Sequence, residues 1–462
     1  MHKVTVNGKV LYAEDGQLLS EVLTASGNGT EHPCGGKGIC KKCLVRVNGK
    51  DELSCRYAVR SDVSVTLNLF SEIVSESGVD TFSDETENMC LALDIGTTTI
   101  ALALVSADTG RAVRVVTKTN PQRVFGADVM SRIEYCTKNG VEDMQKPVVD
   151  VINYMLDEIG AGSVSRMYVS GNATMLHIFF GIDVSSLGVA PYKAVFLESK
   201  TEKGANLGID KTDEIISLPS ISTFVGADIV AGLNYVSLPD DGKYNLLIDL
   251  GTNAEIVLFD NHNFIGTSAA AGPCFEGAGI SCGMSAVSGA VCAYSENGAQ
   301  TIGNVTPKGI CGTGLVDVIA TLLDKSIIDN TGYMEAESVE IAEGVTLTQS
   351  DIRQYQLAKS AVYSAITTLM QMQSVTAEDI DKVYISGGFS AMLNVGNAVR
   401  TGLLPDSLRE KCIAINNSSL LGTVKFAVQN NDLSSIINNS SYVDLSSETD
   451  FSDLFINNMF FK

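Results

Sequence analysis

Alternating apolar and polar residues dominate the first 70 positions of the chain. Four stretches have the period of half-buried strands and are punctuated by Asn-Gly turns: KVTVNG (3–8), KVLYA (9–13), CLVRVNGK (43–50) and VSVTLNLF (63–70). Between the second and third stretches, QLLSEVLTASG (17–27) has the apolar spacing of one short amphipathic helix. The pattern predicts a small β-rich domain with a single helix over residues 1–70.

Continuous apolar runs replace this alternation after residue 88. MCLALDIGTTTIALALV (89–105) consists of an apolar strand, a turn rich in Gly and Thr, and a second apolar strand. NLLIDLGTNAEIVLF (245–259) repeats the design about 155 residues later. The repetition predicts an internally duplicated α/β fold over residues 89–430, with lobes at roughly 89–225 and 226–430.

The turns of the two repeats carry groups suited to a nucleotide triphosphate. An Asp at the end of each first strand can hold a hard cation such as Mg²⁺ through water. The Gly that follows allows a phosphate close to the backbone, and hydroxyls and turn amides can donate to its oxygens. The candidates are Asp94, Gly96, Thr97, Thr98 and Thr99 in the first copy, and Asp249, Gly251, Thr252 and Asn253 in the second.

A third turn lies in VYISGGFSAMLNV (383–395). An apolar strand ends at Ser386, Gly387 and Gly388 open the turn, and an apolar segment follows. Such a turn can form a helix N-terminus whose backbone lies against an adenine and its ribose. Many strand-to-helix turns contain two glycines, so this motif indicates a nucleotide site only in combination with the two hairpins.

Asp228, in STFVGADIVAG, is a candidate for orienting or deprotonating the water that attacks a γ-phosphate. The alternative is that it caps the helix predicted from DIVAGLNYV. Asp128, in FGADVMSRIEY, offers the same choice with a weaker case.

Four of the eleven cysteines cluster near the N-terminus in a Gly-rich setting: Cys34, Cys40, Cys43 and Cys55. Glycines beside thiolates let backbone N–H groups approach sulfur, as iron–sulfur clusters require. The spacing Cys-x5-Cys-x2-Cys with a later cysteine resembles the 2Fe–2S ferredoxin family. A zinc site is the alternative, although zinc ribbons usually have two Cys-x2-Cys knuckles. Most other cysteines read as small core residues, with Cys274 and Cys282 as remote candidates for a second cluster.

Two segments lack the apolar patterns of folded elements. Residues 71–88 carry six acids and no Lys or Arg, which predicts an acidic flexible linker. Residues 431–462, rich in Ser, Asn and Asp, match no motif that indicates a function, and the simplest interpretation is a partly disordered C-terminal tail.

Composition narrows the class of protein. With 462 residues, 45% of them hydrophobic, the chain is globular. A net charge of −22 argues against a nucleic-acid partner. No apolar run approaches the ~20 residues of a membrane helix, and the first residues do not read as a secretory signal. We therefore expect a cytoplasmic protein with no membrane partner.

Together the hairpins and the double-glycine turn resemble the acetate and sugar kinase, Hsp70 and actin superfamily. The resemblance implies two α/β lobes with ATP and Mg²⁺ in the cleft between them. It also places Glu276, in AAAGPCFEGAGISCG, near the nucleotide ribose. The segments 167–181 and 308–323 resemble the connecting segments of that superfamily and would form the crossing between lobes.

The whole chain is similar to the reductive activators of corrinoid-dependent methyltransferases, which join a 2Fe–2S domain to an ATPase of this superfamily. The resemblance implies an ATP-hydrolysing electron transferase that returns a Co(II) corrinoid to Co(I). Its partners would be a corrinoid protein or methyltransferase and an unidentified electron donor. A homodimer stays open.

Three other functions compete with this one. A small-molecule kinase of the same superfamily would not need the cysteine domain. An activator of 2-hydroxyacyl-CoA dehydratases would hold a 4Fe–4S cluster between two subunits. A redox-sensing ATP-dependent clamp or chaperone would bind its partner without reducing it.

Overall fold

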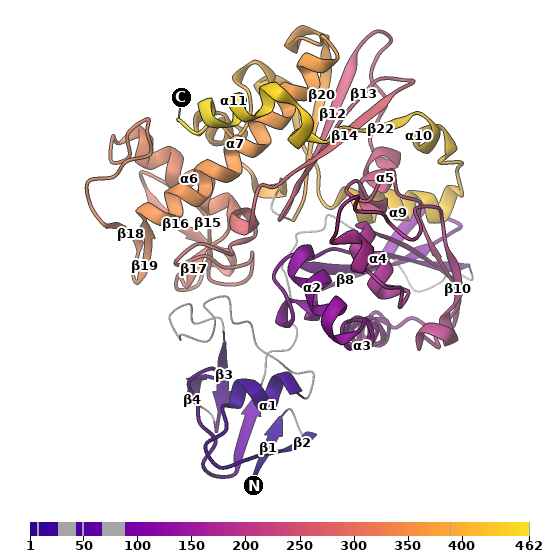
Figure 1. Ribbon diagram of the computed structural model, residues 1–462, viewed down its shortest axis with the longest axis vertical. Coiled ribbons are helices and arrows are strands. Elements are labelled where there is room, and N and C mark those ends of the chain that lie inside the picture. The colour runs from indigo at the N-terminus through magenta and orange to yellow at the C-terminus, as the bar shows by residue number, and fades with distance from the viewer. Residues whose placement is uncertain (7–8, 26–42, 49, 67–87, 389, 462) are drawn as a thin grey trace.

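The computed structural model describes residues 1–462 except 7–8, 26–42, 49, 67–87, 389 and 462. The acidic stretch expected to be a linker therefore lies almost wholly outside the described residues. Three sheets carry the fold (Figure 1): one in the N-terminal region and one in each of two lobes.

The N-terminal region forms a five-stranded sheet in the order β2-β1-β5-β3-β4, with one helix beside it. Its elements are β1 (His2–Val6), β2 (Lys9–Ala13), α1 (Leu19–Ala25), β3 (Leu44–Val47), β4 (Lys50–Leu53) and β5 (Val63–Thr66). The inward residues of the alternating strands, such as Val4 and Val65, pack against Leu19 and Leu23 of α1. The predicted strands and helix are confirmed, and β4 is an additional strand.

The first lobe is built on a six-stranded sheet in the order β10-β11-β9-β6-β7-β8. Its strands are β6 (Met89–Ile95), β7 (Thr99–Ser106), β8 (Arg111–Thr119), β9 (Val164–Gly171), β10 (Thr201–Lys203) and β11 (Thr212–Ser217). Its helices are α2 (Val129–Asn139), α3 (Glu142–Glu158), α4 (Ala173–Phe179) and α5 (Ala227–Tyr235). α5, at the start of the second predicted lobe, packs in an apolar core that holds residues of this first sheet and also Leu247, Val257 and Phe259 of the second sheet.

The second lobe repeats the plan with the order β21-β20-β12-β13-β14-β22. The strands of this sheet are β12 (Tyr244–Leu250), β13 (Ala254–Phe259), β14 (Phe264–Ala269), β20 (Ile380–Ser386), β21 (Cys412–Ala414) and β22 (Ser440–Tyr442). A smaller unit inserted after β14 holds η4 (Pro273–Glu276), β15 (Ala290–Ser295), β16 (Gly298–Thr301), β17 (Gly309–Ile310), β18 (Ser338–Ala342) and β19 (Val345–Thr348). The helical elements that follow these strands in the chain are α6 (Gly312–Asp324), α7 (Gln349–Met372), η7 (Ser390–Met392), α8 (Val395–Arg400), η8 (Asp406–Lys411) and α9 (Ser418–Gln429). Of these, α9 packs on β6, β7 and β9 of the first sheet.

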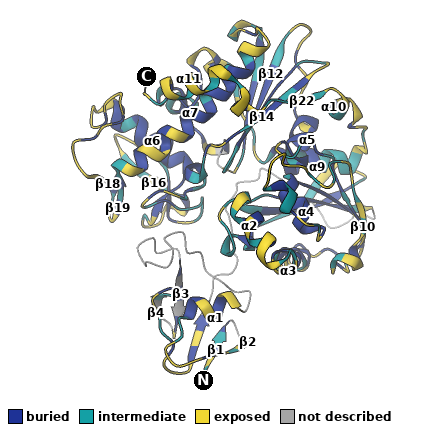
Figure 2. Ribbon diagram, in the orientation of Figure 1, coloured by how far each residue is buried: buried dark blue, intermediate teal, exposed yellow. Residues whose placement is uncertain are grey.

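The pairing of strands confirms the predicted duplication. In each lobe an antiparallel triplet, β6-β7-β8 or β12-β13-β14, is extended by a parallel strand, β9 or β20. The register is equivalent as well, since Asp94 pairs with Ser170 in the first sheet and Asp249 pairs with Ser386 in the second. The first strands of both triplets are almost wholly buried, as Figure 2 shows for β12, which explains their continuous apolar sequence.

The expectation of a partly disordered tail is wrong. Residues after 430 form α10 (Ser434–Asn438), β22, η9 (Leu445–Ser447) and α11 (Thr449–Asn457). β22 extends the second sheet by pairing with β14, and α11 lies along α7 (Figure 1). The side chains of Gln356 and Lys359 in α7 donate to the carbonyls of Met459 and Phe460. The tail is therefore held by specific contacts although its composition is polar.

Candidate nucleotide site and cysteine centre

The first hairpin turn closes between β6 and β7. The amide of Gly96 donates to the carbonyl of Thr99 at 2.9 Å, and a Cβ at position 96 would lie 2.7 Å from that oxygen. Glycine is therefore required by close approach at this turn. The turn is held from outside by Asn120, which donates to the Gly96 carbonyl at 2.8 Å, and by Asn172, which donates to the Thr97 hydroxyl at 3.1 Å.

A wholly buried arginine supports the same turn. Arg132 of α2 donates through Nη2 to the Thr97 carbonyl at 2.6 Å, through Nη1 to Gln122 at 3.0 Å and through Nε to the Gly126 carbonyl at 3.0 Å. Arginine is rarely buried without such partners. Sequence reasoning missed Arg132, because an Arg on an amphipathic helix reads as a solvent-exposed residue.

The second hairpin turn, between β12 and β13, is one residue shorter but is closed in a similar way. The amide of Gly251 donates to the carbonyl of Asn253 at 2.9 Å. Thr252 follows the glycine as Thr97 does in the first turn, and its hydroxyl donates to Glu276.

Glu276, at the end of η4, joins the two turns. Its Oε1 accepts a hydrogen bond from the Thr98 hydroxyl at 2.8 Å, and its Oε2 accepts one from the Thr252 hydroxyl. The resemblance had suggested a ribose contact for this residue. The structure brings its carboxylate against the threonines of both hairpin turns, which come from different lobes.

Asp94 is buried at the end of β6 and tied to the start of α9. Its Oδ2 accepts from Asn417 at 2.7 Å and its Oδ1 accepts from Ser419 at 2.7 Å. Burial raises the pKa of Asp94, and the hydrogen bonds from Asn417, Ser419 and Ser170 oppose that rise. The carboxylate thus anchors a helix that begins more than 300 residues later in the chain.

Asp249 occupies the equivalent place in the second sheet and is half-buried. Burial raises its pKa to about 6, a hydrogen bond from Ser386 lowers it, and the charges of Asp94 and Glu276 raise it further. The hydroxyl oxygens of Ser386 and Ser418 are 2.8 Å apart, and the Ser418 amide donates to Ser386 Oγ at 3.2 Å. The first turn of α9 therefore touches both Asp–Ser pairs, through Ser418 on one side and Ser419 on the other.

Asp228 faces the same carboxylates from the second position of α5. Burial raises its pKa to about 7, with further contributions from the charges of Asp249 and Asp94. It is not the cap of the helix, because Gly226 occupies that position and no side chain caps the helix there. Asp128, the weaker candidate, is a true cap: its carboxylate accepts from the Ser131 amide in a reciprocal capping box.

Glu255 is a further member of this group that sequence reasoning missed. It lies on β13 directly opposite Asp249, and Ser268 donates to it at 3.2 Å. Burial raises its pKa well above the ordinary value, helped by the charges of Asp228 and Asp249. Like charges directly opposite in a sheet are unfavourable. The pairing therefore suits a site that binds a proton or a cation.

The third turn keeps its glycines for different reasons. Gly387 has φ +110°, and a Cβ there would lie 2.2 Å from the Leu250 carbonyl of the neighbouring strand. Nothing lies within 4 Å of a Cβ at Gly388. The first glycine thus serves the fold, and the second leaves open space beside the turn, where a ligand could approach.

The two connecting segments bring backbones into close contact. A Cβ at Gly171 would lie 2.8 Å from the Ile95 carbonyl, beside the first turn. A Cβ at Gly312, the first residue of α6, would lie 2.0 Å from the Phe275 carbonyl in η4. Small residues in these segments therefore pack connecting elements directly against the loops of the site.

Two of the four expected cluster ligands lie within the described residues. Cys43 and Cys55 are both buried, and their Sγ atoms are 3.1 Å apart. Thiolates on one metal ion, with bonds of about 2.3 Å in a tetrahedral arrangement, lie roughly 3.8 Å apart. The two sulfurs would have to move about 0.7 Å farther apart to bind the same ion, a shift that side-chain rotation can supply. Cys34 and Cys40 lie outside the described residues.

A second cluster at Cys274 and Cys282 finds no support. Burial raises the pKa of the Cys274 thiol to about 12, which disfavours the thiolate that a cluster needs. Cys282 lies near Thr346, whose amide is 3.5 Å from its sulfur. Across the described ranges, no three His, Cys, Asp or Glu side chains are arranged to hold a metal ion, and no helix could cross a membrane.

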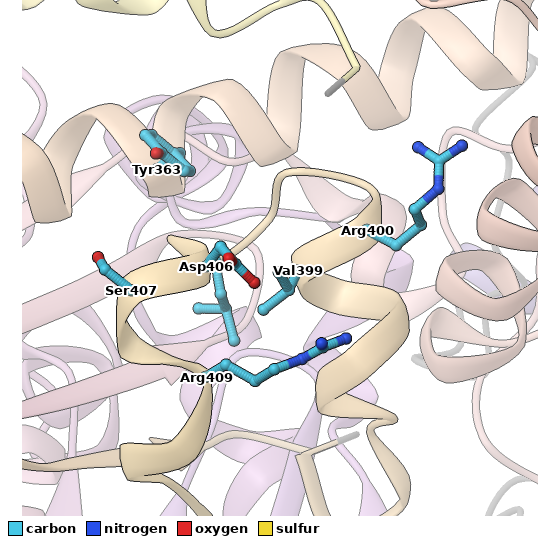
Figure 3. Close-up of a pocket in the computed structure, with 7 residues that line it drawn as sticks. Tyr363, Val399, Arg400, Asp406, Ser407 and Arg409 are labelled. Carbon is cyan, nitrogen blue, oxygen red and sulfur yellow. The ribbon is translucent and has the colours of Figure 1, made fainter.

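A pocket of about 480 Å³ lies apart from these groups, between α7, α8 and η8 (Figure 3). Arg400 and Arg409 line it together with Asp406. Arg400 is paired with Asp324 of α6 at 2.7 Å. The charges of this pocket are thus partly satisfied by neighbouring carboxylates, and none of its residues was a candidate from the sequence.

Comparisons with known proteins agree with this architecture. Residues 89–241 match the family model described as the RACo middle region, and residues 243–462 match the C-terminal domain of RACo, the ASKHA domain. The boundary between the two matches lies after α5 and before β12.

Three relatives extend the likeness along the chain. The corrinoid activation enzyme RamQ of Eubacterium limosum is 27% identical, with 96% of each chain covered. The [Co(II) methylated amine-specific corrinoid protein] reductase of Methanosarcina barkeri is 26% identical over 75% of this chain and 71% of its own. A solved structure of a reductive activator for corrinoid, iron–sulfur protein has a TM-score of 0.74 and 25% identity, covering 100% of this chain and 98% of its own. The chain belongs to the RACo family of reductive activators and has the duplicated fold of the acetate and sugar kinase, Hsp70 and actin superfamily.

Proposed function

We propose that this chain is an ATP-dependent reductive activator that transfers a low-potential electron to the Co(II) corrinoid of a methyltransferase system, restoring Co(I). The observation that carries the proposal is the pair of phosphate turns, from two lobes, whose threonines meet on one carboxylate. Relatives described as acting on corrinoid proteins support the choice of partner.

The nucleotide would lie between the two turns and the Ser386–Gly388 turn. Gly96–Thr99 and Gly251–Asn253 would donate to phosphate oxygens, and Asp249 would hold Mg²⁺ through water. Both oxygens of Asp94 already accept hydrogen bonds from α9, which makes Asp94 a positioning group for that helix as well as a metal-side charge. Asp228, with its raised pKa, suits the acceptor of a proton from the attacking water.

Cys34, Cys40, Cys43 and Cys55 would hold a 2Fe–2S cluster. When bound, such a cluster supplies single electrons near roughly −400 mV if it behaves as in plant-type ferredoxins. Each ~59 mV of deficit costs a factor of ten in a one-electron equilibrium. An acceptor a few hundred millivolts lower would therefore stay oxidised unless nucleotide binding or hydrolysis favours the reduced state.

The cysteine pair distinguishes this proposal from a sugar kinase, because phosphoryl transfer needs no electrons. We also propose a cytoplasmic location, because a reducing compartment keeps cysteines available as metal ligands.

The decisive experiment mixes the purified protein with a Co(II) corrinoid protein, a chemical reductant and ATP, and follows the Co(I) absorption. We expect Co(I) only when ATP is present. Reduction at the same rate and extent without ATP would reject the coupling. Phosphorylation of a sugar, with residues 1–70 dispensable, would favour the kinase.

A further inference from the structure

Glu276 occupies a position that the nucleotide-binding role of the two turns does not explain. Its carboxylate accepts the hydroxyl hydrogens of both Thr98 and Thr252. Those hydroxyls belong to turns from different lobes, and η4, which bears Glu276, belongs to the unit inserted into the second lobe. One side chain thus links the two halves of the site.

A threonine hydroxyl has a single hydrogen to donate. While Thr98 and Thr252 donate to Glu276, neither can donate to a phosphate oxygen. Phosphate contact and Glu276 contact therefore exclude each other at both hydroxyls. A carboxylate and a phosphate also repel, so both cannot remain beside the same donors without a cation between them.

We propose that Glu276 is an exchangeable latch: its carboxylate holds the two turns together, and the phosphates of a nucleotide displace it and take over both hydroxyls. The inference rests on the proposed function, since it concerns the nucleotide at that same site. It goes further by assigning Glu276 a regulatory role: when a nucleotide binds, the release of Glu276 changes the position of η4 within the second lobe.

The residues on either side of Glu276 are in close contact with two neighbouring segments. The Phe275 carbonyl, one residue before Glu276, lies against Gly312 so closely that a Cβ at position 312 would be 2.0 Å away. Gly277, one residue after Glu276, has φ +74°, and a Cβ there would lie 2.0 Å from the Met284 carbonyl. A shift of η4 must therefore be accommodated by the start of α6 and by the loop near Met284.

The test compares nucleotide binding in four variants that form a cycle: wild type, Glu276→Ala, Thr98→Val and the double variant. Affinity for ADP is measured by calorimetry with Mg²⁺ and with EDTA. We expect Glu276→Ala to bind about tenfold more tightly, which corresponds to about 1.4 kcal/mol. Thr98→Val should weaken binding strongly in the Glu276→Ala background and only slightly in the wild type, where the hydroxyl must first be released.

Hydrogen exchange gives a readout independent of affinity. In the wild type, ADP should change the exchange of residues 270–284 and of the first turn of α6. In Glu276→Ala, the protein without nucleotide should already show that change. Glu343→Gln removes an exposed carboxylate from the β18–β19 turn and serves as the charge-matched control, with no expected effect.

The outcomes separate the two proposals. Wild-type protein that binds no nucleotide would reject the proposed function. Wild-type protein that binds ADP normally would leave that function standing. The latch would then be rejected by purely additive effects of the two substitutions, or by weaker ADP binding in Glu276→Ala.

Discussion

Asp228 offers a direct test of the electrostatics of the site. Burial and the charges of Asp249 and Asp94 raise its pKa from 3.8 to about 7. Below pH 3.8 the carboxyl is protonated in both the folded and the unfolded chain. Between pH 3.8 and 7 the unfolded chain ionises while the folded protein keeps its proton, so the free energy of unfolding falls as pH rises. Above pH 7 the cost is constant.

The Asp228→Asn variant cannot ionise and should escape this cost. At 1.36 kcal/mol per pKa unit, the two units between pH 5 and pH 7 make the advantage of the variant grow by about 3 kcal/mol from pH 5 to pH 8. This is a ceiling, since solvent reaches the half-buried side chain. At roughly 2 °C per kcal/mol for a large domain, the difference in Tm should widen by up to about 5 °C.

Thermal unfolding of both proteins at pH 5 and pH 8 measures this difference. The solutions contain EDTA and no nucleotide, because a bound cation would lower the pKa of nearby carboxyls. Asp108→Asn, at an exposed residue between β7 and β8, is the control and should give the same difference in Tm at both pH values. An Asp228→Asn difference that does not change with pH would refute the reasoning.

Four further predictions concern the cysteine centre and the nucleotide site. Cys40→Ser should abolish the visible 2Fe–2S absorption and the electron-spin signal of the reduced protein; survival of the spectrum would rule out this ligand. Asp249→Ala should keep that absorption and lose ATP-dependent reduction of the corrinoid partner, whereas unchanged ATP turnover would contradict a metal-side role. Gly387→Ala should lose ADP binding or fold poorly, because its Cβ would meet the Leu250 carbonyl at 2.2 Å, while Gly388→Ala, with open space around it, should fold normally in circular dichroism. ATP turnover should rise with pH as Asp228 loses its proton, with a midpoint below pH 7 because bound Mg²⁺ lowers the pKa of nearby carboxyls, and a rate that falls with rising pH would exclude Asp228 as the base.

The hairpins and the duplication could be predicted because their signals are local. An apolar strand, an acid and a glycine within a dozen residues define each turn, and the second copy confirms the first. The structure contains both turns, and it also shows that Asp94 pairs with Ser170 as Asp249 pairs with Ser386.

The contacts that complete the site could not be predicted, since they join residues hundreds of positions apart. Nothing near Asp94 in the sequence indicates Asn417 and Ser419, and nothing near Thr98 indicates Glu276. Asn417 does have a local signal, because Asn-Ser-Ser before an apolar run is typical of a helix start, and Asn417 caps α9. That signal locates a helix without revealing its partner.

The tail was misjudged because composition was given more weight than periodicity. Phe451, Leu454 and Phe455 have the i, i+3, i+4 spacing of an amphipathic helix, and they lie in α11. Phe461 is 3% exposed in the core of the second sheet. A small apolar stripe within a polar segment was enough to dock it.

The first turn of α9 has a mechanical consequence. Asn417 and Ser419 donate hydrogen bonds to Asp94 of one sheet, and Ser418 is hydrogen-bonded to Ser386 of the other. A rigid-body rotation of the lobes about this point would displace atoms in proportion to their distance from it. Groups close to this point would keep their spacing during such a rotation, and residues at the outer edges of the lobes would move farthest.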